Sequence, residues 1–472
     1  MARYLGYGET ATRPGNYFNY DKKGAEAISG ASDGTTAVLF RADWGPLNKA
    51  VVRTADEGYK DAFGTGGSTD VIALTYEGGT RDAVLVRVGT GDTAATVTLK
   101  TGGESPVDAV KFTAKFVGSR AFTVSVRDSV SNDALRECIV YVGTEEFEKV
   151  TFAKGGNEVA ALIAAFANSG NFAVGNAGTT AVTGVMATVT QTAFTAGADP
   201  AVTTADYSAG LSVLEQYGQN AVIFDTSDYG VISLATAYVQ RMFNAGKNVI
   251  AVVGEEKTVD LDTRIQHAAA CNANNVVYVL NGTVEHGLYG TIDGYRTAAK
   301  IAGMIVGTSC KFSLTHSVLS SVTELNELLT EGYINRAEES GCLVLTLNPT
   351  RQVWIDAAIN TLVTLAKNQD AGWKKIRRTR TRFELLSRAN NTVDQMVGQV
   401  DNDGPGRMAI MDAIRGIGVA MIGEGKLAYM DVSEDPTHPA EGDSAWFIID
   451  VVDKDSAEHL YLRYLFRYST QA

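Results

Sequence analysis

Between residues 220 and 306, short apolar runs alternate with stretches of helical periodicity, and this alternation constrains the fold more than any other feature of the sequence. The apolar runs are residues 220–225, 248–254 and 275–280, and helices are expected near 230–245, 259–273 and 291–306. Strands that alternate with helices form parallel sheets, because each helix returns the chain across one face of the sheet. The sequence therefore predicts a central α/β domain.

Residues 94–198 have a different pattern. Runs at 96–99, 110–117, 121–127 and 137–142 alternate apolar and polar residues between Gly, Asn, Asp and Ser, which is typical of antiparallel β structure. One Ala-rich helix is expected at 158–168. Residues 159–198 carry no charge, but Asn and Thr side chains interrupt them, so they predict β structure rather than a membrane span. We interpret 94–198 as an inserted, mostly β domain.

The predicted fold class is a mixed α+β and α/β multidomain protein. The 472 residues of the chain exceed the usual size of one domain. The expected parts are an N-terminal arm at 1–25, a central α/β domain with parallel βα units at 26–93 plus 199–345, the inserted β-rich outer domain at 94–198, an inner α+β domain at 346–457, and a C-terminal arm strand at 458–472.

The overall charge restricts the partners of this protein. Its 41 Lys and Arg against 54 Asp and Glu give a net charge of -13, which argues against nucleic acid or an anionic membrane as the main partner. The cysteines are too far apart for a clustered metal site and indicate a reducing compartment; they are Cys138, Cys271, Cys310 and Cys342. The first residues lack the apolar run of a signal peptide, so we expect the chain to be made and kept in a cytoplasm.

No sequence motif indicates catalysis. Residues 30–34 match G-x-S-x-G, the motif of a nucleophile elbow. That motif requires a helix after the serine, but here a β-rich run follows, so we predict that residues 30–34 form a loop that leads into a strand. The five histidines are scattered, and neither phosphate-binding glycine motif occurs in the βα units. Asp225 and Asp228 follow the first of those strands and are suited to hold a metal or to cap the next helix; capping is favoured. We predict no catalytic, cofactor-binding or metal-binding residue and no cofactor.

Residues 374–382 contain six basic residues in nine, within an acidic chain. We interpret this run as a strand, and its alternation then puts like charge on both faces, which is costly unless an acidic surface neutralises it. Docking to an acidic protein surface is favoured. A solvated face is the second interpretation, and nucleic acid is the least favoured because aromatic residues occur only at the ends of the run.

The even positions of residues 460–468 are all apolar or aromatic, which predicts a long strand. Two interpretations stay open. The strand is central in its own domain, or it is donated to a neighbouring copy, with residues 16–20 doing the same elsewhere. A head-to-tail exchange of strands does not close as a dimer and propagates as rings or a helix.

The order of these segments resembles that of contractile tail sheath proteins, found in myophages, phage-tail-like bacteriocins and related contractile injection systems. Residues 13–19 resemble the R-P-G-x-Y-x-N arm of that family. Residues 358–362, the basic run, the helix start at 403–407 and the acidic segment 450–461 follow in the family's order. The helix after residue 407 departs from the family, because it is rich in Ala, Gly and Met where a more polar helix is expected.

The resemblance implies a structural subunit and no enzyme. Such subunits polymerise as stacked hexameric rings around an inner tail tube and contract to drive the tube through a cell envelope. The implied partners are further copies of the chain, the tube protein, and baseplate and tail terminator proteins, without nucleic acid or direct membrane contact. The implied location is a virion or phage-tail-like particle assembled in a bacterial host cytoplasm.

The resemblance also assigns residues to three contact surfaces. The inter-subunit N-terminal arm comprises Arg13, Pro14, Gly15, Tyr17 and Phe18, and the C-terminal arm comprises Leu460, Tyr461, Leu462, Tyr464, Phe466 and Tyr468. The tube-facing set is Lys374, Lys375, Arg377, Arg378, Arg380, Arg382, Arg407 and Arg415. Two other functions remain as alternatives: a cytoplasmic nucleotide-binding enzyme that uses the central βα units, and a receptor-binding or decorating surface protein.

Overall fold

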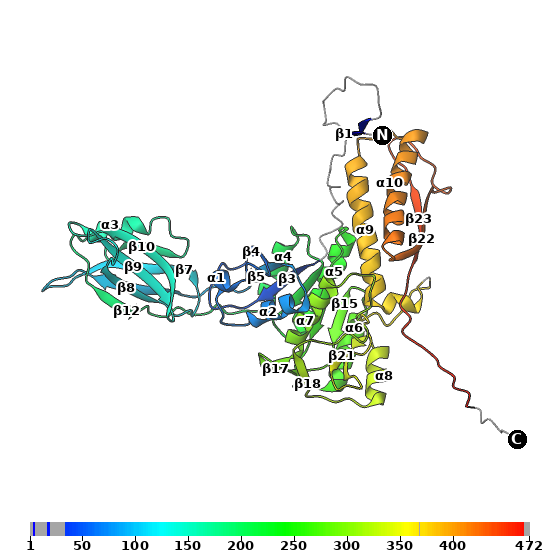
Figure 1. Cartoon of the computed structure of the whole chain (residues 1–472), viewed down its shortest axis with the longest axis horizontal. Helices are drawn as coiled ribbons and strands as arrows, with labels where there is room; N and C mark the ends of the chain where they lie inside the picture. The colour runs from blue at the N-terminus through cyan, green and yellow to red at the C-terminus, as the bar shows by residue number, and fades with distance from the viewer. Residues whose placement is uncertain (1–2, 5–16, 19–33, 368, 467–472) are drawn as a thin grey trace.

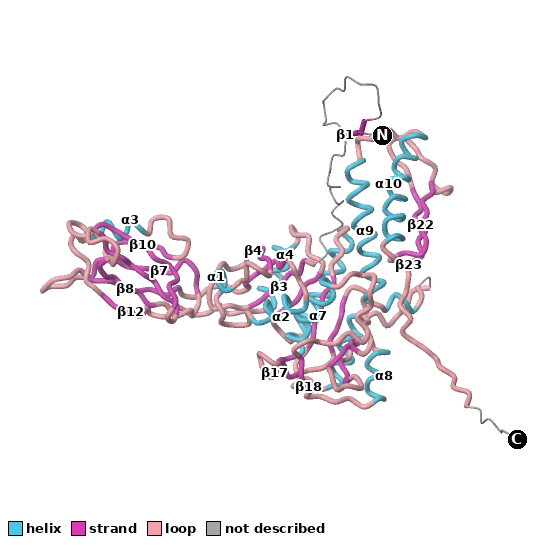
Figure 2. Tube along the Cα trace, in the orientation of Figure 1, coloured by secondary structure: helices cyan, strands magenta, loops and turns pink. Residues whose placement is uncertain are grey.

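The computed structural model describes residues 3–4, 17–18, 34–367 and 369–466 of the chain. An α/β body lies at the centre, with a β-rich unit at one end of the long axis and two long helices with a β hairpin at the other (Figure 1). The last described residues run away from the body. Figure 2 shows that strands dominate the distant unit, whereas helices dominate the C-terminal part. The predicted mixed α+β and α/β class is confirmed.

The body is built on a seven-stranded sheet in the order β19-β15-β14-β13-β3-β5-β4. Neighbouring strands pair in parallel except β4, which runs antiparallel to β5. The strands are β3 (Thr35–Phe40), β4 (Ala50–Thr54), β5 (Asp82–Arg87), β13 (Ala221–Phe224), β14 (Ile250–Gly254), β15 (Val276–Val279) and β19 (Cys342–Leu343). The strands predicted at 220–225, 248–254 and 275–280 are therefore confirmed.

Helices cover both faces of this sheet, so its strands are buried on both sides. Val38 and Phe40 lie in the core beneath α2 and α7, whereas Ala37 and Leu39 face the opposite core. The helices are α2 (Asp70–Gly78), α4 (Thr204–Leu214), α5 (Tyr229–Asn244), α6 (Leu261–Cys271), α7 (Gly294–Gly307) and α8 (Glu331–Glu339), with a short α1 (Lys60–Phe63). The three helices expected after the apolar runs correspond to α5, α6 and α7.

Two small sheets complete the body. One joins β16 (Thr283–His286), β17 (Gly290–Asp293) and β18 (Val322–Leu325), and the other pairs β20 (Leu345–Leu347) with β21 (Val353–Ile355). Helices α2 and α7 approach closely, because a Cβ atom at Gly303 would overlap the carbonyl oxygen of Thr75. Glycine is therefore required at this crossing.

The inserted unit is a pair of antiparallel sheets, β10-β9-β8-β12 and β11-β7-β6, that share one aromatic core. Its elements are β6 (Ala94–Lys100), β7 (Asp108–Val117), β8 (Thr123–Asp128), β9 (Leu135–Val142), β10 (Glu145–Ala153), α3 (Glu158–Ala165), β11 (Phe172–Asn176) and β12 (Val189–Ala193). The antiparallel β structure and the helix that the sequence predicts in this region are present.

Trp44 joins this unit to the body. It lies in the loop after β3, outside 94–198, yet only 1% of it is exposed, because it packs in the core of the inserted unit. Its ring is 5.0 Å from that of Phe116 and 4.9 Å from that of Phe122. Arg87, at the end of β5, donates hydrogen bonds to the carbonyls of Ala42 and Val117 and so ties the same loop to β7. The connection is therefore a packed joint rather than a bare linker.

The C-terminal part is a helical pair followed by a hairpin. Its elements are the 3-10 helix η1 (Ala371–Lys374), α9 (Ile376–Met396), α10 (Gly404–Gly423), β22 (Leu427–Glu434) and β23 (Phe447–Asp453). Asp403 caps α10, since its side chain accepts a hydrogen bond of 2.8 Å from the amide of Gly406. The helix start predicted at 403–407 is confirmed.

The prediction that the basic run 374–382 is a strand is wrong, because most of it forms the first turns of α9. Ile376, Thr379 and Phe383 are all buried and recur at spacings of three and four, which is the helical period. The two-residue alternation holds only within the nine basic-rich residues. It does not extend to Met396, where the helix ends.

The described residues of the two ends are extended. β1 (Arg3–Tyr4) pairs in parallel with β2 (Tyr17–Phe18), which falls within the strand expected at 16–20. Residues 460–466 form no strand in the structure and are exposed, with Tyr461 at 93%. The interpretation of this segment as a central strand of its own domain is therefore wrong, because no part of the described chain covers it.

Removing the Trp44 side chain should loosen the joint. We expect Trp44→Ala to lower the free energy of unfolding by about 3–5 kcal/mol, because it leaves a cavity in an aromatic core. Chemical denaturation followed by circular dichroism measures this loss. Val130→Ala, at a side chain that is 90% exposed, is the control and should stay within about 0.5 kcal/mol of the parent protein. A similarly small effect of Trp44→Ala would contradict the packed joint.

Candidate functional site

The start of α9 binds the segment that leads into the C-terminal arm. Arg378 makes two bonds with Asp453, at the end of β23: Nε to Oδ2 and Nη2 to Oδ1 are both 2.7 Å. Lys375 Nζ lies 2.9 Å from a carboxylate oxygen of Asp455 and 3.1 Å from one of Glu458. We call these five residues the arm clasp.

Glu458 also binds the body of the protein. It accepts hydrogen bonds from the hydroxyls of Ser313 at 2.8 Å and Thr315 at 3.3 Å. Burial alone would raise the pKa of Glu458, but hydrogen bonds from Ser456, Ser313 and Lys375 outweigh burial and lower it. The clasp therefore joins the α/β body, α9 and the root of the arm in one network of charged hydrogen bonds.

The geometry around Arg378 requires a glycine nearby. A Cβ atom at Gly372, in η1, would overlap the Arg378 guanidinium. Because glycine has no Cβ atom, Arg378 Nη1 also reaches a carboxylate oxygen of Asp370 at 2.9 Å, and the guanidinium is held between two carboxylates. The pKa of Arg378 lies above its ordinary value, mainly because the guanidinium donates hydrogen bonds to Asp453.

The clasp ends at Glu458, and the exposed apolar segment begins two residues later. Leu460, Leu462, Tyr464 and Phe466 are all exposed, as is Tyr461. The chain thus changes within two residues from a fixed root to a projecting apolar segment. Of the predicted arm residues, Arg13, Pro14, Gly15 and Tyr468 lie outside the described residues, and Tyr17 and Phe18 form β2.

The other predicted tube-facing residues contact different parts of the chain. Arg377 is buried near Asp455, Arg380 donates to the carbonyl of Thr308, and Arg382 stacks on Trp373. Arg407 pairs with Glu434 at 2.9 Å, and Arg415 pairs with Asp431 and Asp412. Among the described residues, no ion pair involves Lys374. Acidic residues of the same chain thus supply most of the acidic surface that the basic run requires. The sequence alone did not predict these ion pairs. Whether these residues face a tube stays a prediction.

The hairpin beside the clasp has an incomplete sheet. β22 and β23 pair only with each other, so each strand has one outer edge without a partner strand among the described residues. Its exposed side chains include Tyr429, Ile448, Ile449 and Val452. The hairpin packs on α9 and α10 through its other face, and its open strand edges can readily accept a further strand. The hairpin is therefore suited to accept an added strand.

The two aspartates that follow the first predicted strand are already bound within the chain. Asp228 caps α5 by accepting a bond of 2.8 Å from the amide of Gly230, which confirms capping for that residue. Asp225 is fully buried instead and accepts hydrogen bonds from Arg41 and Tyr207. Within the described ranges, no group of three or more His, Cys, Asp or Glu side chains is arranged to hold a metal. No described helix is both long and apolar enough to span a membrane.

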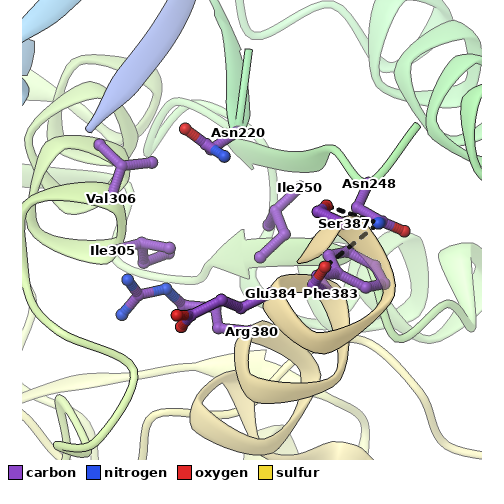
Figure 3. A pocket seen from close by; sticks show the side chains of 9 residues that line it. All are labelled: Asn220, Asn248, Ile250, Ile305, Val306, Arg380, Phe383, Glu384 and Ser387. Carbon is purple, nitrogen blue, oxygen red and sulfur yellow. Dashed lines mark hydrogen bonds between the residues drawn. The ribbon is translucent and has the colours of Figure 1, made fainter. Parts of the chain in front are cut away.

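A small cavity lies where α9 meets the amino ends of the central sheet (Figure 3). Its volume is about 30 Å³, which is the space of about one water molecule. Asn248 spans this junction by donating to the carbonyl of Phe383 at 3.2 Å and to the hydroxyl of Ser387 at 3.1 Å. The cavity is far too small for a nucleotide, and its lining attaches α9 to the body.

Residues 200–361 match the family model of the phage tail sheath protein central domain. No curated protein matches the sequence. The sheath tail protein of Desulfitobacterium hafniense has a TM-score of 0.70 at 17% identity, covering 93% of this chain and 100% of that chain. The sheath tail protein of Listeria innocua has a TM-score of 0.67 at 18% identity, covering 89% and 95%.

The anti-feeding prophage helical sheath in its contracted state is also similar, with a TM-score of 0.54 at 10% identity and coverage of 97% of this chain and 99% of that chain. Residues 200–361 therefore match the central domain of phage tail sheath proteins, and the chain has the fold of sheath tail proteins, which confirms the resemblance stated from the sequence. These matches favour a structural sheath role over a nucleotide-binding enzyme.

Adjacent lysines provide a matched test of the clasp. We expect Lys375→Met to speed hydrogen exchange of residues 454–458 at neutral pH, because Asp455 and Glu458 both lose their ion pair with the Lys375 ammonium. Lys374→Met removes the same charge one residue earlier and should leave this exchange unchanged. Equal effects of the two substitutions would show that general charge, and not the clasp geometry, holds the root.

Acid should open the clasp. The pKa values of Asp455 and Glu458 both lie below their ordinary values of 3.8 and 4.5. A carboxylate with a lowered pKa stabilises the folded state above its unfolded pKa and loses that contribution as pH falls through the folded one. A spin label at His459→Cys should therefore be restrained at pH 6 and become mobile below about pH 4. In the Lys375→Met background the label should already be mobile at pH 6. A label whose mobility in the parent protein does not change with pH would contradict this assignment.

Proposed function

We propose that this chain is the structural subunit of a contractile tail sheath, polymerising as stacked hexameric rings around an inner tail tube. The observation that carries the proposal is the C-terminal arm. Its root is fixed to the body at Glu458, yet residues 460–466, which are apolar or aromatic except for Arg463, are exposed and without a covering surface in the described chain. Such a segment is suited to bury its side chains in another copy.

The energetics favour strand donation. A fully buried Leu or Phe side chain contributes about 1.5–3 kcal/mol relative to an exposed one, and residues 460–466 offer several of them. The hairpin of β22 and β23 offers open edges and an exposed apolar face. When one copy donates to the next, the exchange is head-to-tail, so it propagates into rings or a helix instead of closing as a dimer.

The proposed parts of the subunit follow the division expected from the sequence. Residues 1–25 and 458–472 are the exchanged arms, 26–93 with 199–345 form the central domain, 94–198 lie outward, and 346–457 lie inward against the tube. The proposed tube contact includes Lys374, Arg407 and Arg415, which are partly exposed. It agrees with the position of the α9–α10 part at the end opposite the inserted unit (Figure 1).

The proposed mechanism is mechanical, and the protein is not an enzyme. Subunits assemble in an extended lattice and move as rigid bodies into a shorter, wider one, which drives the tube through a target envelope. The similar anti-feeding prophage sheath is a helical sheath in a contracted state. A similar extracellular contractile injection system sheath is also in a contracted state. The proposed partners are the tube, baseplate and tail terminator proteins, and the proposed location is a phage-tail-like particle assembled in a bacterial cytoplasm.

Electron microscopy of the purified chain tests this proposal. We expect tubes or rings from the full chain and folded monomers after deletion of residues 461–472, because the deletion removes the donated strand but leaves the clasp. Circular dichroism checks that the shortened chain is folded. Tubes that persist after the deletion would refute the arm assignment. A full chain that stays monomeric under every assembly condition would refute the sheath role itself.

A further inference from the structure

A cavity of about 310 Å³ lies beyond the carboxyl ends of β3 and β5. Arg41 directly follows β3 and Val88 directly follows β5, whereas Tyr295 and Arg296 belong to the first turn of α7. β3 leads to β5 on one side of the sheet and β13 leads to β14 on the other, so the strand order reverses at this edge. Parallel sheets with helices on both faces bind ligands outside the carboxyl ends of their strands at such a reversal.

The loop before α2 forms one wall of this cavity. The amide of Ser68 donates to the carbonyl of Arg41 at 2.9 Å, which joins the loop to the end of β3. A Cβ atom at Gly67 would lie 2.6 Å from the same carbonyl oxygen, and the φ angle of Gly67 is +66°. Glycine is therefore required for this wall to approach the sheet so closely.

Two arginines line the cavity, and a carboxylate fixes each of them at one edge of its guanidinium. Arg41 donates from Nε to the Asp225 carboxylate and from Nη2 to the Asp225 carbonyl, both at 2.8 Å. Arg296 Nε lies 2.9 Å from Asp70 Oδ2. Nη1 of Arg41 and both terminal nitrogens of Arg296 have no hydrogen-bond partner among the residues that the structure describes. Each guanidinium thus keeps donors that the protein does not use.

Two buried hydroxyls in the lining also lack partners. Ser68 is 5% exposed and Tyr295 is 8% exposed, and neither hydroxyl makes a hydrogen bond within the described ranges of the chain. Burial raises the pKa of Tyr295, so its hydroxyl keeps its proton at neutral pH and can donate. Buried polar groups without partners are costly and rare, so they indicate a further molecule at this place.

The charges of the lining favour an anion. Its acidic residue is Asp199, and Ser119 already holds both oxygens of that carboxylate, through its amide at 2.8 Å and its hydroxyl at 2.7 Å. The carboxylates of Asp225 and Asp70 are not part of the lining. The first turn of α7 adds the positive end of a helix dipole and amides that have no acceptor within the helix. An anion with several acceptor oxygens meets all of these donors.

We infer that this cavity binds a phosphate group, with the guanidinium groups of Arg41 and Arg296 and the hydroxyls of Ser68 and Tyr295 as its donors. A phosphate group offers several acceptor oxygens, and arginine guanidinium groups bind such oxygens in pairs. The volume lies at the lower end of the range of small-molecule sites, about 300–1,000 Å³. This inference is independent of the proposed sheath function and involves no chemical reaction.

The position of the cavity connects binding to the joint between the body and the inserted unit. Its lining includes Ala42, which lies two residues before Trp44, and Asp199 and Pro200, where the chain returns from the inserted unit. A bound phosphate group therefore contacts both chain connections of the packed joint. We expect it to slow hydrogen exchange in residues 41–44 and 199–202.

Isothermal titration calorimetry of the full chain with pyrophosphate, at constant ionic strength, tests the site. We expect saturable binding of one pyrophosphate per chain. Ser68→Ala and Tyr295→Phe should each weaken it about tenfold, because a hydrogen bond to a charged group is lost. Neither substitution should lower the melting temperature of the ligand-free chain, because neither hydroxyl has a partner there. Arg296→Met should weaken binding at least as much.

Arg81→Met is the matched control for Arg296→Met. Arg81 directly precedes β5, at the opposite end of that strand from the cavity, and its side chain is 73% exposed. This variant should bind pyrophosphate like the parent chain. Equal losses with Arg81→Met and Arg296→Met would show attraction by general charge and would overturn the site.

A comparison of inorganic phosphate, pyrophosphate and ATP identifies the source of the phosphate group. ATP that binds no more tightly than pyrophosphate would assign the site to free phosphate species, and ATP that binds more tightly would assign it to a nucleotide. Absence of saturable binding by all three, or binding that survives both hydroxyl substitutions, would overturn the inference. Exchange of residues 41–44 and 199–202 that pyrophosphate does not slow, compared with sodium chloride at the same ionic strength, would also contradict it.

Discussion

The ion pairs between the start of α9 and residues 453–458 determine where the body of this protein ends and where its arm begins. Arg378 and Lys375 hold three carboxylates that follow one another closely along the chain, and Glu458 adds bonds to the α/β body. Residues 459–466 are exposed to solvent. The clasp therefore fixes the root of this segment without covering its apolar side chains.

The same pairs explain how an acidic chain accommodates a dense basic run. Repulsion among six neighbouring cations is costly, and here acidic side chains from the end of the hairpin offset much of it. Arg382 is the exception, because Trp373 covers its guanidinium while both terminal nitrogens have no hydrogen-bond partner in the part of the chain that the structure describes.

The inserted unit shows how domain limits in sequence and in space differ. The change of pattern at residue 94 predicts antiparallel structure, and that structure is present. Yet Trp44, fifty residues earlier, completes its aromatic core. A single tryptophan in a loop after a parallel strand gives no periodic signal, since its burial depends on Phe116 and Phe122, which the chain brings to it only in three dimensions.

By itself, the sequence determined the parallel βα units, the β-rich insertion, the capped start of α10 and the resemblance to tail sheath proteins, because each depends on local periodicity or on the order of segments. It predicted a terminal strand at 460–468 but left open whether that strand is central in its own domain or is donated to a neighbouring copy. The tertiary structure alone decided that the basic run is helical, since the buried positions of α9 depend on packing beyond the nine residues that alternate. The tertiary structure alone also showed that Asp453, Asp455 and Glu458 neutralise that run. These ion pairs join segments about 80 residues apart, so neither segment has a local sequence pattern that predicts them.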